Sequence, residues 1–520
     1  MANVSRRTFL GTAGLAAASV ASGAAVAVAD EVSQNIVWDE EADIVILGFG
    51  LAGINAAKVA GIDEGMSVIV LEKAPETYAG GATRVNGGTA ALLGATALLY
   101  GSFGAIDQDL YDAMAAEDSV FVNWFTNEVG VNRVNDMFID GYGRALWEGT
   151  SAKVLESENI TVHFLAPALK LIKGSDGEVH GVKAFFDEKE RFVKARKAVI
   201  VCTGSYVGNK ELVWGSHYPY LPYEICNSPY NEGDGVFMIA DAGGAVMKDT
   251  SLALEFFGWA MEPASAEVGT AMLMEDMNWR QQDFTHARIY VNKNGKRFMA
   301  EDIADTHDRT TYRFTDWAGI PGKSYAGGAG NGYINLPMWA VMDSKVVDAG
   351  CLWMSPEWSP AHVYGWGSWS EDNQAEVEKG WLLKADTLEE LAAKMTSTDP
   401  VTGEPVAVDV EGFLATVEEY NALCASGEED PLGKDKAYLT GIDAGPFYAV
   451  ELVPALGYTN SGVPSNNNSQ VLTWNNEVVP RLYAAGDVGQ GMRCIMLTMN
   501  GCAARGAIAA RHAAGLENWE

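Results

Sequence analysis

The hydrophobic pattern near position 45 predicts a buried strand, a tight turn, a helix and a second buried strand in quick succession. Residues 43–47 read Asp-Ile-Val-Ile-Leu and residues 67–71 read Ser-Val-Ile-Val-Leu. Short apolar runs rich in β-branched residues are typical of strands that are buried on both faces of a parallel sheet. Between the two runs, three glycines and an Ala-rich stretch to Ala60 predict a turn that leads directly into a helix.

The glycines of this turn have the G-x-G-x-x-G spacing of a dinucleotide-binding site. Gly48 permits the tight turn, Gly50 lets a pyrophosphate approach the backbone, and Gly53 allows helix and strand to pack closely. The phosphates are then expected on the free N–H groups at the helix N-terminus, which begins at Leu51 and Ala52.

An acid and a second glycine loop extend this site. Glu72 ends the second strand, where a carboxylate accepts hydrogen bonds from ribose hydroxyls, and Lys73 follows it. A loop with four glycines between positions 80 and 88 can lie flat against a planar ligand. Cofactor contacts are therefore expected from Gly80, Gly81, Thr83, Asn86, Gly87 and Gly88.

Three later segments have a similar character. Residues 198–205 predict a buried strand that delivers Thr203 and Gly204 to a bound dinucleotide. Residues 231–235, Asn-Glu-Gly-Asp-Gly, precede a helical pattern, so Asp234 is expected to cap that helix. A final Ala-rich helix begins near position 500, and its N-terminus supplies N–H donors and a positive dipole.

The middle of the chain differs in composition. Residues 250–384 hold nine of the fifteen tryptophans, and an Asn294-Gly295 turn predicts a hairpin over 289–298. We expect an inserted α+β capping domain over 250–384. Residues 30–249 and 385–520 are then the two parts of one α/β, Rossmann-like domain of the glutathione-reductase type.

The first 29 residues have the features of a twin-arginine signal peptide. Arg6 and Arg7 precede a Gly/Ala-rich apolar stretch, and Ala27-Val28-Ala29 supplies a cleavage site. A permanent N-terminal anchor fits this weakly apolar stretch less well. We expect a protein exported in its folded state to the periplasm or cell envelope, soluble or peripheral.

Charge and cysteine spacing exclude several classes of function. A formal net charge of −33 repels nucleic acid and anionic lipid, so neither is expected as a partner. The six cysteines form no C-x-x-C motif, which argues against attached haem and against zinc. No metal is expected, although an iron–sulfur cluster assembled from distant cysteines stays open.

Taken in this order, the motifs resemble those of the FAD-dependent fumarate reductase and 3-ketosteroid dehydrogenase superfamily. Further matches are residues 291–298, 482–487 and 500–503. The resemblance covers the chain from about Asp43 to its end, and it implies FAD buried between the two domains, with hydride transfer at flavin N5. It also implies cofactor contacts from Gly486, Asp487, Gly501, Cys502 and Ala503.

The chain departs from the fumarate reductases at their cationic positions. Their proton-donating arginine corresponds to the segment 301–305, with Arg309 one helical turn later, and their carboxylate-clamping arginine corresponds to Thr498. Tyr458 stands where they carry a histidine and instead resembles a phenol of the ketosteroid branch. Because a buried dianion needs fixed cations, this pattern favours a neutral substrate. The residues expected near the flavin face are Tyr458, Tyr333, Arg309, Arg493 and Tyr230.

Three functions stay open from the sequence. The first is reduction of a conjugated C=C bond in a bulky neutral enone or lactone, as in cardiac-glycoside-type reductases, with electrons from a membrane quinol or a cytochrome-type carrier. The second is reduction of a small acid such as fumarate, urocanate or an acrylate by way of Arg309 and Arg493. The third is flavin electron transfer without a substrate. The sequence does not fix the direction, so the dehydrogenase reaction also stays open.

Overall fold

The computed structural model describes fourteen stretches of the chain. These are residues 36–86, 107–134, 139–209, 211–212, 224–225, 227–246, 253–261, 271–274, 288–301, 335–352, 370–399, 403–459, 462–489 and 499–519. The expectations for the signal segment 1–29 and for Gly87, Gly88, Arg309, Tyr333 and Arg493 lie outside them. Within the described stretches, no helix has the length and apolar character needed to cross a bilayer.

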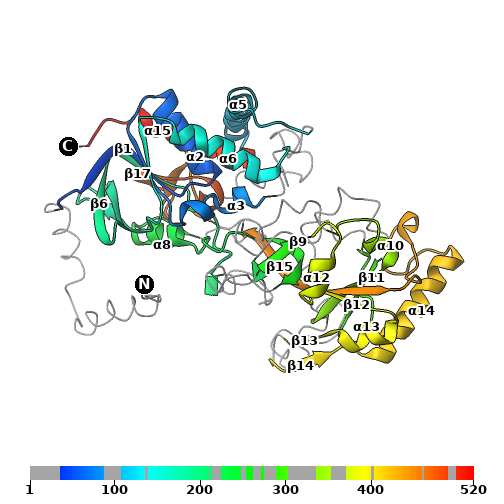
Figure 1. Ribbon diagram of the computed structural model, residues 1–520. Helices are drawn as coiled ribbons and strands as arrows, with labels where there is room; N and C mark the ends of the chain where they lie inside the picture. Colours follow the sequence, from blue (N-terminus) through cyan, green and yellow to red (C-terminus); the bar gives the residue numbers. More distant parts are fainter. Residues whose placement is uncertain are drawn as a thin grey trace, which may run out of the picture.

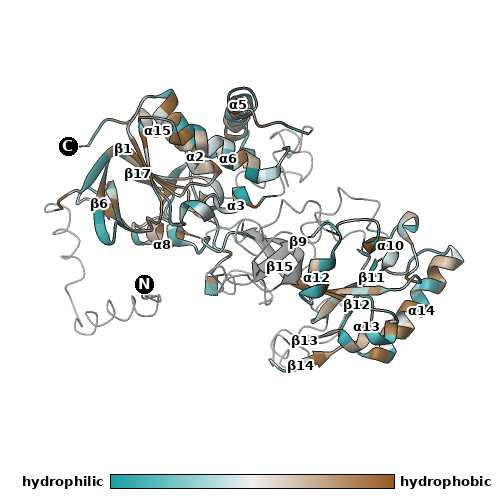
Figure 2. Cartoon of the chain, in the orientation of Figure 1, coloured by the Kyte–Doolittle hydropathy of each residue, from teal (hydrophilic) through white to brown (hydrophobic). Residues whose placement is uncertain are grey.

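The first lobe is built on an eight-stranded sheet whose central part is parallel (Figure 1). The parallel strands lie in the order β17 (Val478–Ala484), β6 (Lys189–Val201), β1 (Glu40–Leu47), β2 (Val68–Leu71) and β3 (Ile160–His163). Ile44, Val45, Ile46 and Leu47 of β1 are fully buried, and Figure 2 shows β1 and β17 as largely hydrophobic. The expected α/β class with buried parallel strands is confirmed.

Antiparallel strands extend this sheet. β16 (Gln470–Leu472) pairs with β17, while β5 (Val179–Phe186) pairs with both β6 and β4 (Ala168–Lys173). β3 and β4 are close in sequence but are two separate strands. The chain turns between them at Leu165, whose φ is +54°.

Helices of the first lobe include α2 (Leu51–Ala57), which continues as the π-helix η2 (Lys58–Asp63), and α15 (Met499–Ala514). α2 and α15 pack closely, since Asn55 of α2 donates a hydrogen bond to the carbonyl of Ala503 of α15 at 2.8 Å. A Cβ added to Gly506 would lie 2.2 Å from the Ala52 carbonyl oxygen. The other helical segments are η3 (Glu76–Tyr78), α3 (Gly81–Arg84), α5 (Gln108–Asn123), η4 (Trp124–Val129), α6 (Tyr142–Leu155), α8 (Asp234–Asp241) and η9 (Gly486–Gly489).

The second lobe is built on a seven-stranded sheet in which β15 (Phe447–Thr459) is the longest strand. The first half of β15 lies between β11 (Met338–Asp343) and β12 (Leu382–Ala385), and its second half pairs with β8 (Ala253–Met261) and β7 (Glu224–Ile225). β10 (Arg288–Asn292) adds to β11, and β9 (Ala271–Met274) adds to β8. In Figure 1, β15 (orange) runs from the region between the lobes into the second lobe.

Smaller elements complete the second lobe, and its sheet does not coincide with the expected domain limits. They are α10 (Ser344–Val347), α12 (Gln374–Glu378), α13 (Leu388–Lys394), β13 (Thr396–Thr398), β14 (Pro405–Ala407), α14 (Val410–Ser426) and η8 (Lys436–Tyr438). The expected boundaries at 250 and 384 would exclude β7, α14 and β15, yet β7 and β15 are strands of this sheet. The helices α13 and α14, which follow residue 385, therefore belong to the second lobe (Figure 1).

A buried ionic network joins the segment that follows β10 to the segment that follows α14. Arg297 donates hydrogen bonds to Glu301 at 2.8 and 2.9 Å and to Asp430 at 2.9 and 3.1 Å. Lys434 lies 3.4 Å from Glu301, and all four charged side chains are at most 8% exposed. Burial opposes ionisation of Asp430, but the hydrogen bonds and charge of Arg297 outweigh it and lower its pKa.

Asp430→Asn should therefore destabilise the protein by about 3 kcal/mol at pH 7, because it leaves buried positive charge undercompensated. The contribution of a carboxylate with a lowered pKa is present above about pH 4 and is lost as the pH falls through the lowered value. The difference in the free energy of unfolding between wild type and variant should thus shrink at pH 3. Urea unfolding followed by tryptophan fluorescence at both pH values measures it.

Asp443→Asn is the matched control, because Asp443 pairs with Lys345 at 2.6 Å but is 68% exposed. Such a pair contributes about 1 kcal/mol or less. Equal costs for the two variants at pH 7 would contradict the assignment of the network.

Candidate cofactor site

The turn after β1 shows why each of its glycines is needed. Gly48 has a φ of +98°, and a Cβ there would lie 2.5 Å from the Cys202 carbonyl oxygen. A Cβ on Gly53 would lie 2.0 Å from the Gly48 carbonyl oxygen, so the helix can approach the strand only with glycine at this position. Gly50 differs: its φ is −76°, and the nearest described atom to its added Cβ, outside its chain neighbours, is the Gly80 carbonyl oxygen at 3.6 Å. Within the described residues, neither backbone conformation nor packing requires glycine at position 50.

The second glycine loop packs directly on this turn. Thr83 Oγ1 accepts a hydrogen bond from the Leu51 N–H at 3.0 Å, and Trp147 Nε1 donates to the Phe49 carbonyl at 2.9 Å. Gly80 has a φ of +113°, and its added Cβ would lie 2.9 Å from the Trp147 ring. Gly80 and Thr83 therefore lie beside the start of α2. Asn86, at the end of the same loop, accepts a hydrogen bond from the Gly143 N–H of α6 at 3.1 Å, and the contact of these residues with the cofactor stays a prediction.

Glu72 is buried beside the same turn. Its two carboxylate oxygens accept hydrogen bonds from the N–H groups of Phe49 and Ala74, each at 2.7 Å. Burial raises the pKa of Glu72, while these N–H donors and the Lys73 charge oppose the shift. The carboxylate thus orders the turn and lies where a ribose is expected.

Lys73 and Asp234 meet, although Asp234 does not cap α8. Gly233, with a φ of +82°, occupies the N-cap position, and Asp234 is the first residue of the helix. The Lys73 ammonium lies 2.5 Å from Asp234 and 2.9 Å from Glu232. The acid therefore ties the end of β2 to α8 by an ion pair rather than through a capping hydrogen bond.

The loop after β6 holds a buried hydroxyl, that of Thr203. Its Oγ1 is shielded from solvent and has no hydrogen-bond partner within the described parts of the chain. A Cβ on Gly235 would lie 2.2 Å from it. Gly204 has a φ of +74°, and a Cβ there would lie 2.8 Å from Asn231 Oδ1. Thr203 and Gly204 are thus placed beside the N-terminal end of α8.

The C-terminal motif closes on the glycine turn from the other side. A Cβ on Gly486 would lie 2.9 Å from Ala52 Cβ, and the Cys502 thiol lies 3.6 Å from Asp487 Oδ1. Burial raises the pKa of Cys502, and the nearby Asp487 raises it further, so the thiol stays protonated at neutral pH. Gly501 and Ala503 lie in the first turns of α15.

Asn500 is a functional candidate that the expected site did not include. Its side chain is fully buried at the start of α15, and neither Oδ1 nor Nδ2 has a hydrogen-bond partner among the residues that the structure describes. A buried amide without partners costs about 1–3 kcal/mol, so such a group calls for a ligand or water. The only sequence signal was its position in the motif 500–503.

These observations fit FAD. The space next to Gly50 is not filled by any described side chain. Thr203 and Asn500 carry buried polar atoms that have no hydrogen-bond partner among the described residues. The N-terminus of α2 supplies N–H donors for phosphates. FAD bound here supplies hydride transfer at its flavin ring.

Two of the five expected catalytic residues lie in described parts of the chain. Tyr458 lies near the end of β15, paired with Leu254 of β8 just after a register shift. Tyr230 is partly buried and its N–H donates to Ser228 Oγ at 3.3 Å, in the segment that leads to α8.

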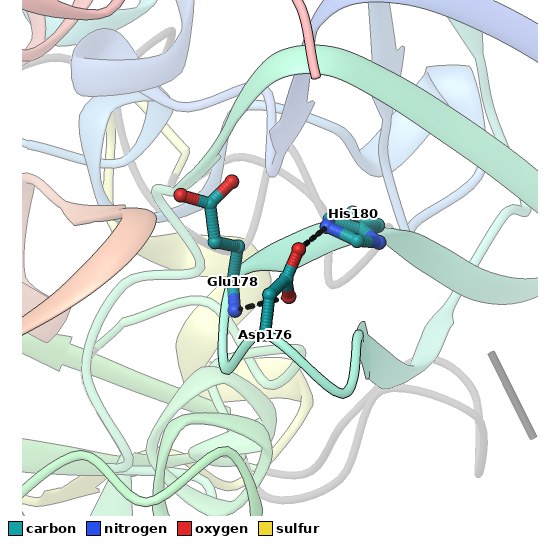
Figure 3. A group of neighbouring side chains, drawn as sticks. All are labelled: Asp176, Glu178 and His180. Carbon is teal, nitrogen blue, oxygen red and sulfur yellow. Dashed lines mark hydrogen bonds and ion pairs between the residues drawn. The ribbon is translucent and has the colours of Figure 1, made fainter. Parts of the chain in front are cut away.

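A separate cluster of Asp176, Glu178 and His180 lies at the turn between β4 and β5 (Figure 3). His180 contacts Asp176 at 3.0 Å, and its ring stacks on Trp519 with centroids 3.9 Å apart. Glu178 accepts a hydrogen bond from Arg481. These contacts fasten the C-terminal tail to the turn, and the pairing of Glu178 with a cation disfavours a metal ion there.

Comparison with known proteins places this geometry in context. A family model described as "FAD binding domain" matches residues 139–496. The chain is 26% identical to the vinyl phenol reductase of Lactiplantibacillus plantarum, with 86% of this chain and 90% of that protein covered. It is 27% identical to the 3-oxosteroid 1-dehydrogenase of Mycolicibacterium smegmatis (68% and 58% covered) and 23% identical to the NADH:fumarate oxidoreductase of Klebsiella pneumoniae (90% and 46%). The chain thus spans only about half the length of these last two relatives.

Solved structures show the same fold. A flavocytochrome c3 fumarate reductase in an open conformation superposes with a TM-score of 0.69 at 21% identity, over 92% of this chain and 78% of that one. The 3-ketosteroid Δ1-dehydrogenase of Sterolibacterium denitrificans gives a TM-score of 0.65 at 17% identity, over 91% and 99%. Both likenesses concern the fold, while the family and its FAD cofactor rest on the match of residues 139–496 to the FAD binding domain.

The glycine turn yields a prediction that separates folding from cofactor binding. Gly50→Ala should leave the apoprotein as stable as wild type, because its Cβ meets only ordinary contacts at 3.6 Å or more. It should weaken FAD binding at least tenfold, about 1.4 kcal/mol, because the added methyl group takes the space left for the pyrophosphate. FAD titration of apoprotein and thermal unfolding without FAD measure the two effects.

Gly53→Ala is the contrasting variant. Its Cβ would overlap the Gly48 carbonyl at 2.0 Å, so it should lower the melting temperature of the apoprotein as well. If Gly50→Ala binds FAD as tightly as wild type, the pyrophosphate does not lie at this turn.

Proposed function

This chain belongs to the FAD binding domain family, and from that premise we propose that it reduces a conjugated C=C bond in a bulky, mostly uncharged molecule such as an enone or unsaturated lactone. As a member of the fumarate reductase and ketosteroid dehydrogenase superfamily, it is an FAD-dependent oxidoreductase that acts on CH–CH bonds. The choice of a neutral substrate is our proposal.

The observation that carries the proposal is the position of Tyr458. This residue lies two positions after Leu456, near the end of the strand that leads from the second lobe back to the first. The resemblance places a histidine of the acid-reducing enzymes at the same position. A phenol there can donate a hydrogen bond or a proton without adding a fixed positive charge.

The charges of the described cofactor loops agree with this choice. Lys73 is paired with Glu232 and Asp234. Arg84 lies over the Trp147 ring at 4.5 Å and donates to the carbonyls of Thr77 and Ala79. Cations held in this way are not available to neutralise two substrate carboxylates.

In the proposed reaction, FAD held at the glycine turn after β1 and at the Thr203–Gly204 loop would supply the hydride that the β-carbon of the acceptor takes up. The protein polarises the carbonyl of the enone or lactone with a hydrogen-bond donor, and Tyr458 or an arginine delivers a proton to the α-carbon. The relative named vinyl phenol reductase is in line with an uncharged unsaturated acceptor. The second candidate is reduction of a small unsaturated acid, which the relatives named for fumarate and acrylate favour.

We also propose that electrons come from a separate carrier, of the membrane quinol or cytochrome type. The superposition on a flavocytochrome supports the idea that this fold accepts electrons from such a group. We propose export by the twin-arginine route to the periplasm or envelope as well, because Arg6 and Arg7 precede a Gly/Ala-rich apolar stretch and a cleavage site at Ala27-Val28-Ala29.

Tyr458→Phe should lower the turnover rate by about a hundredfold, the lower range for loss of a general acid, and leave the flavin absorbance unchanged. Tyr448→Phe is the control, because Tyr448 is a buried phenol in the same strand, paired with Met342 in the half of β15 away from the first lobe. The assay follows oxidation of reduced viologen with a steroid enone, an unsaturated lactone, 4-vinylphenol, a cinnamate, urocanate and fumarate. Turnover of the acids alone would overturn the proposal.

Replacing both Arg6 and Arg7 by lysine should leave the protein in the cytoplasm with its signal segment attached. Fractionation and the mass of the N-terminal peptide measure this. Normal export of the variant would contradict the twin-arginine route.

A further inference from the structure

One short segment, residues 224–225 and 227–234, contacts both lobes. Its first part is β7, which pairs in parallel with β15: Glu224 lies opposite Ala455, and Ile225 lies opposite Leu456. Tyr458 follows Leu456 by two residues in the same strand. The beginning of this segment is therefore part of the second-lobe sheet, next to the proposed proton donor. We call residues 224–225 and 227–234 the coupling segment.

The end of the coupling segment lies among the cofactor loops. Asn231 is 5% exposed, and its Oδ1 lies 2.8 Å from a Cβ built on Gly204 and 3.7 Å from one built on Gly81. The Asn231 carbonyl also accepts a hydrogen bond from the Gly208 N–H at 2.7 Å. The Asn231 side chain thus lies beside both the glycine loop after β2 and the glycine loop after β6. The cofactor is expected to contact both loops.

The two ends are connected through buried polar contacts. Asn231 Nδ2 donates to Asn227 Oδ1 at 3.3 Å, and the Asn231 N–H donates to the Ser228 carbonyl at 3.2 Å. Asn227 and Ser228 are 5% and 1% exposed. Asn227 follows Ile225 of β7 by only two residues. Few residues therefore separate the hydrogen bond between Asn231 and Asn227 from β7.

We propose that the coupling segment transmits FAD binding to the position of β15, and that Asn231 is the positioning residue. A cofactor lying between the Gly81 and Gly204 loops fixes Asn231, and Asn227 and β7 then fix the end of β15 that carries Tyr458. The coupling itself rests on the FAD site, and only its consequence for catalysis rests on the proposed function.

Linkage makes the inference testable without a substrate. If FAD favours the paired state of β7 and β15, then FAD must slow hydrogen exchange in that part of β15. We expect FAD to lower the exchange rate of peptides covering 447–459 about five- to tenfold in the wild type. The same peptides serve as the readout for every variant, with FAD occupancy read from flavin absorbance.

Asn231→Ala should remove most of this FAD-dependent protection at saturating FAD, while peptides from β1 and α2 keep theirs. Asn227→Ala should act in the same way without touching the glycine loops, so it tests the link even if Asn231→Ala binds FAD too weakly to saturate. Asn209→Ala is the matched control. Asn209 is a nearby amide that donates to the Glu232 carbonyl at 3.2 Å, and the link to β7 does not pass through it.

Equal FAD-dependent protection of 447–459 in wild type, Asn231→Ala and Asn227→Ala would overturn the proposal. Absence of protection in the wild type would overturn it as well. Neither result would affect the proposed substrate class, which depends on the viologen assay and on Tyr458→Phe.

Discussion

The structure depends on close contacts between main-chain atoms at the carboxyl ends of the parallel strands. Glycines allow these contacts because they place no side chain between the two segments. Gly53 lets α2 rest on the Gly48 carbonyl, and Gly506 lets α15 rest on the Ala52 carbonyl. These contacts bring two helix N-terminal regions and two glycine loops to one place. The arrangement leaves the side-chain polar atoms of Thr203 and Asn500 buried without hydrogen-bond partners among the described residues. A dinucleotide with a polar ring system is the kind of ligand that satisfies them.

The two lobes divide the physical work. The first lobe holds the cofactor by backbone contact and hydrogen bonds, and its cation next to the strand ends, Lys73, is neutralised by acids of the same loops. The second lobe holds one buried ionic network, in which Arg297, Lys434, Glu301 and Asp430 join the segment after β10 to the segment after α14. β15 connects these two environments, because its first half belongs to the interior of the second lobe and its last residues face the first lobe.

Local patterns in the sequence predicted the parts of the fold that local forces determine. The β1–α2–β2 unit was predictable because apolar runs and glycine spacing each have one physical interpretation there. The hairpin at Asn294-Gly295 was predictable for the same reason, and Gly295 indeed has a φ of +67°. The limits of the second lobe were not predictable, because β7 has two residues and β15 pairs with strands far away in the sequence.

The candidate site shows the same division. The gathering of the glycines and Glu72 around the turn after β1 was predictable, because it is set by backbone geometry within one β-α-β unit. The ion pair of Asp234 with Lys73 could not, because it joins residues 161 positions apart, and Gly233 supplies the N-cap. Asn500 carried no signal beyond its motif, since only the packed structure shows that its amide is buried without partners.

The order of the strands has a consequence for how this chain is made. β17 completes the parallel sheet beside β6, and β15 stands at the centre of the other sheet, yet both come from the last quarter of the chain. A chain emerging from the ribosome cannot close either sheet until β15 and β17 have been synthesised. Its nascent form exposes long strand edges that invite wrong pairing. These edges stay open to other partners until β15 and β17 take their places in the two sheets.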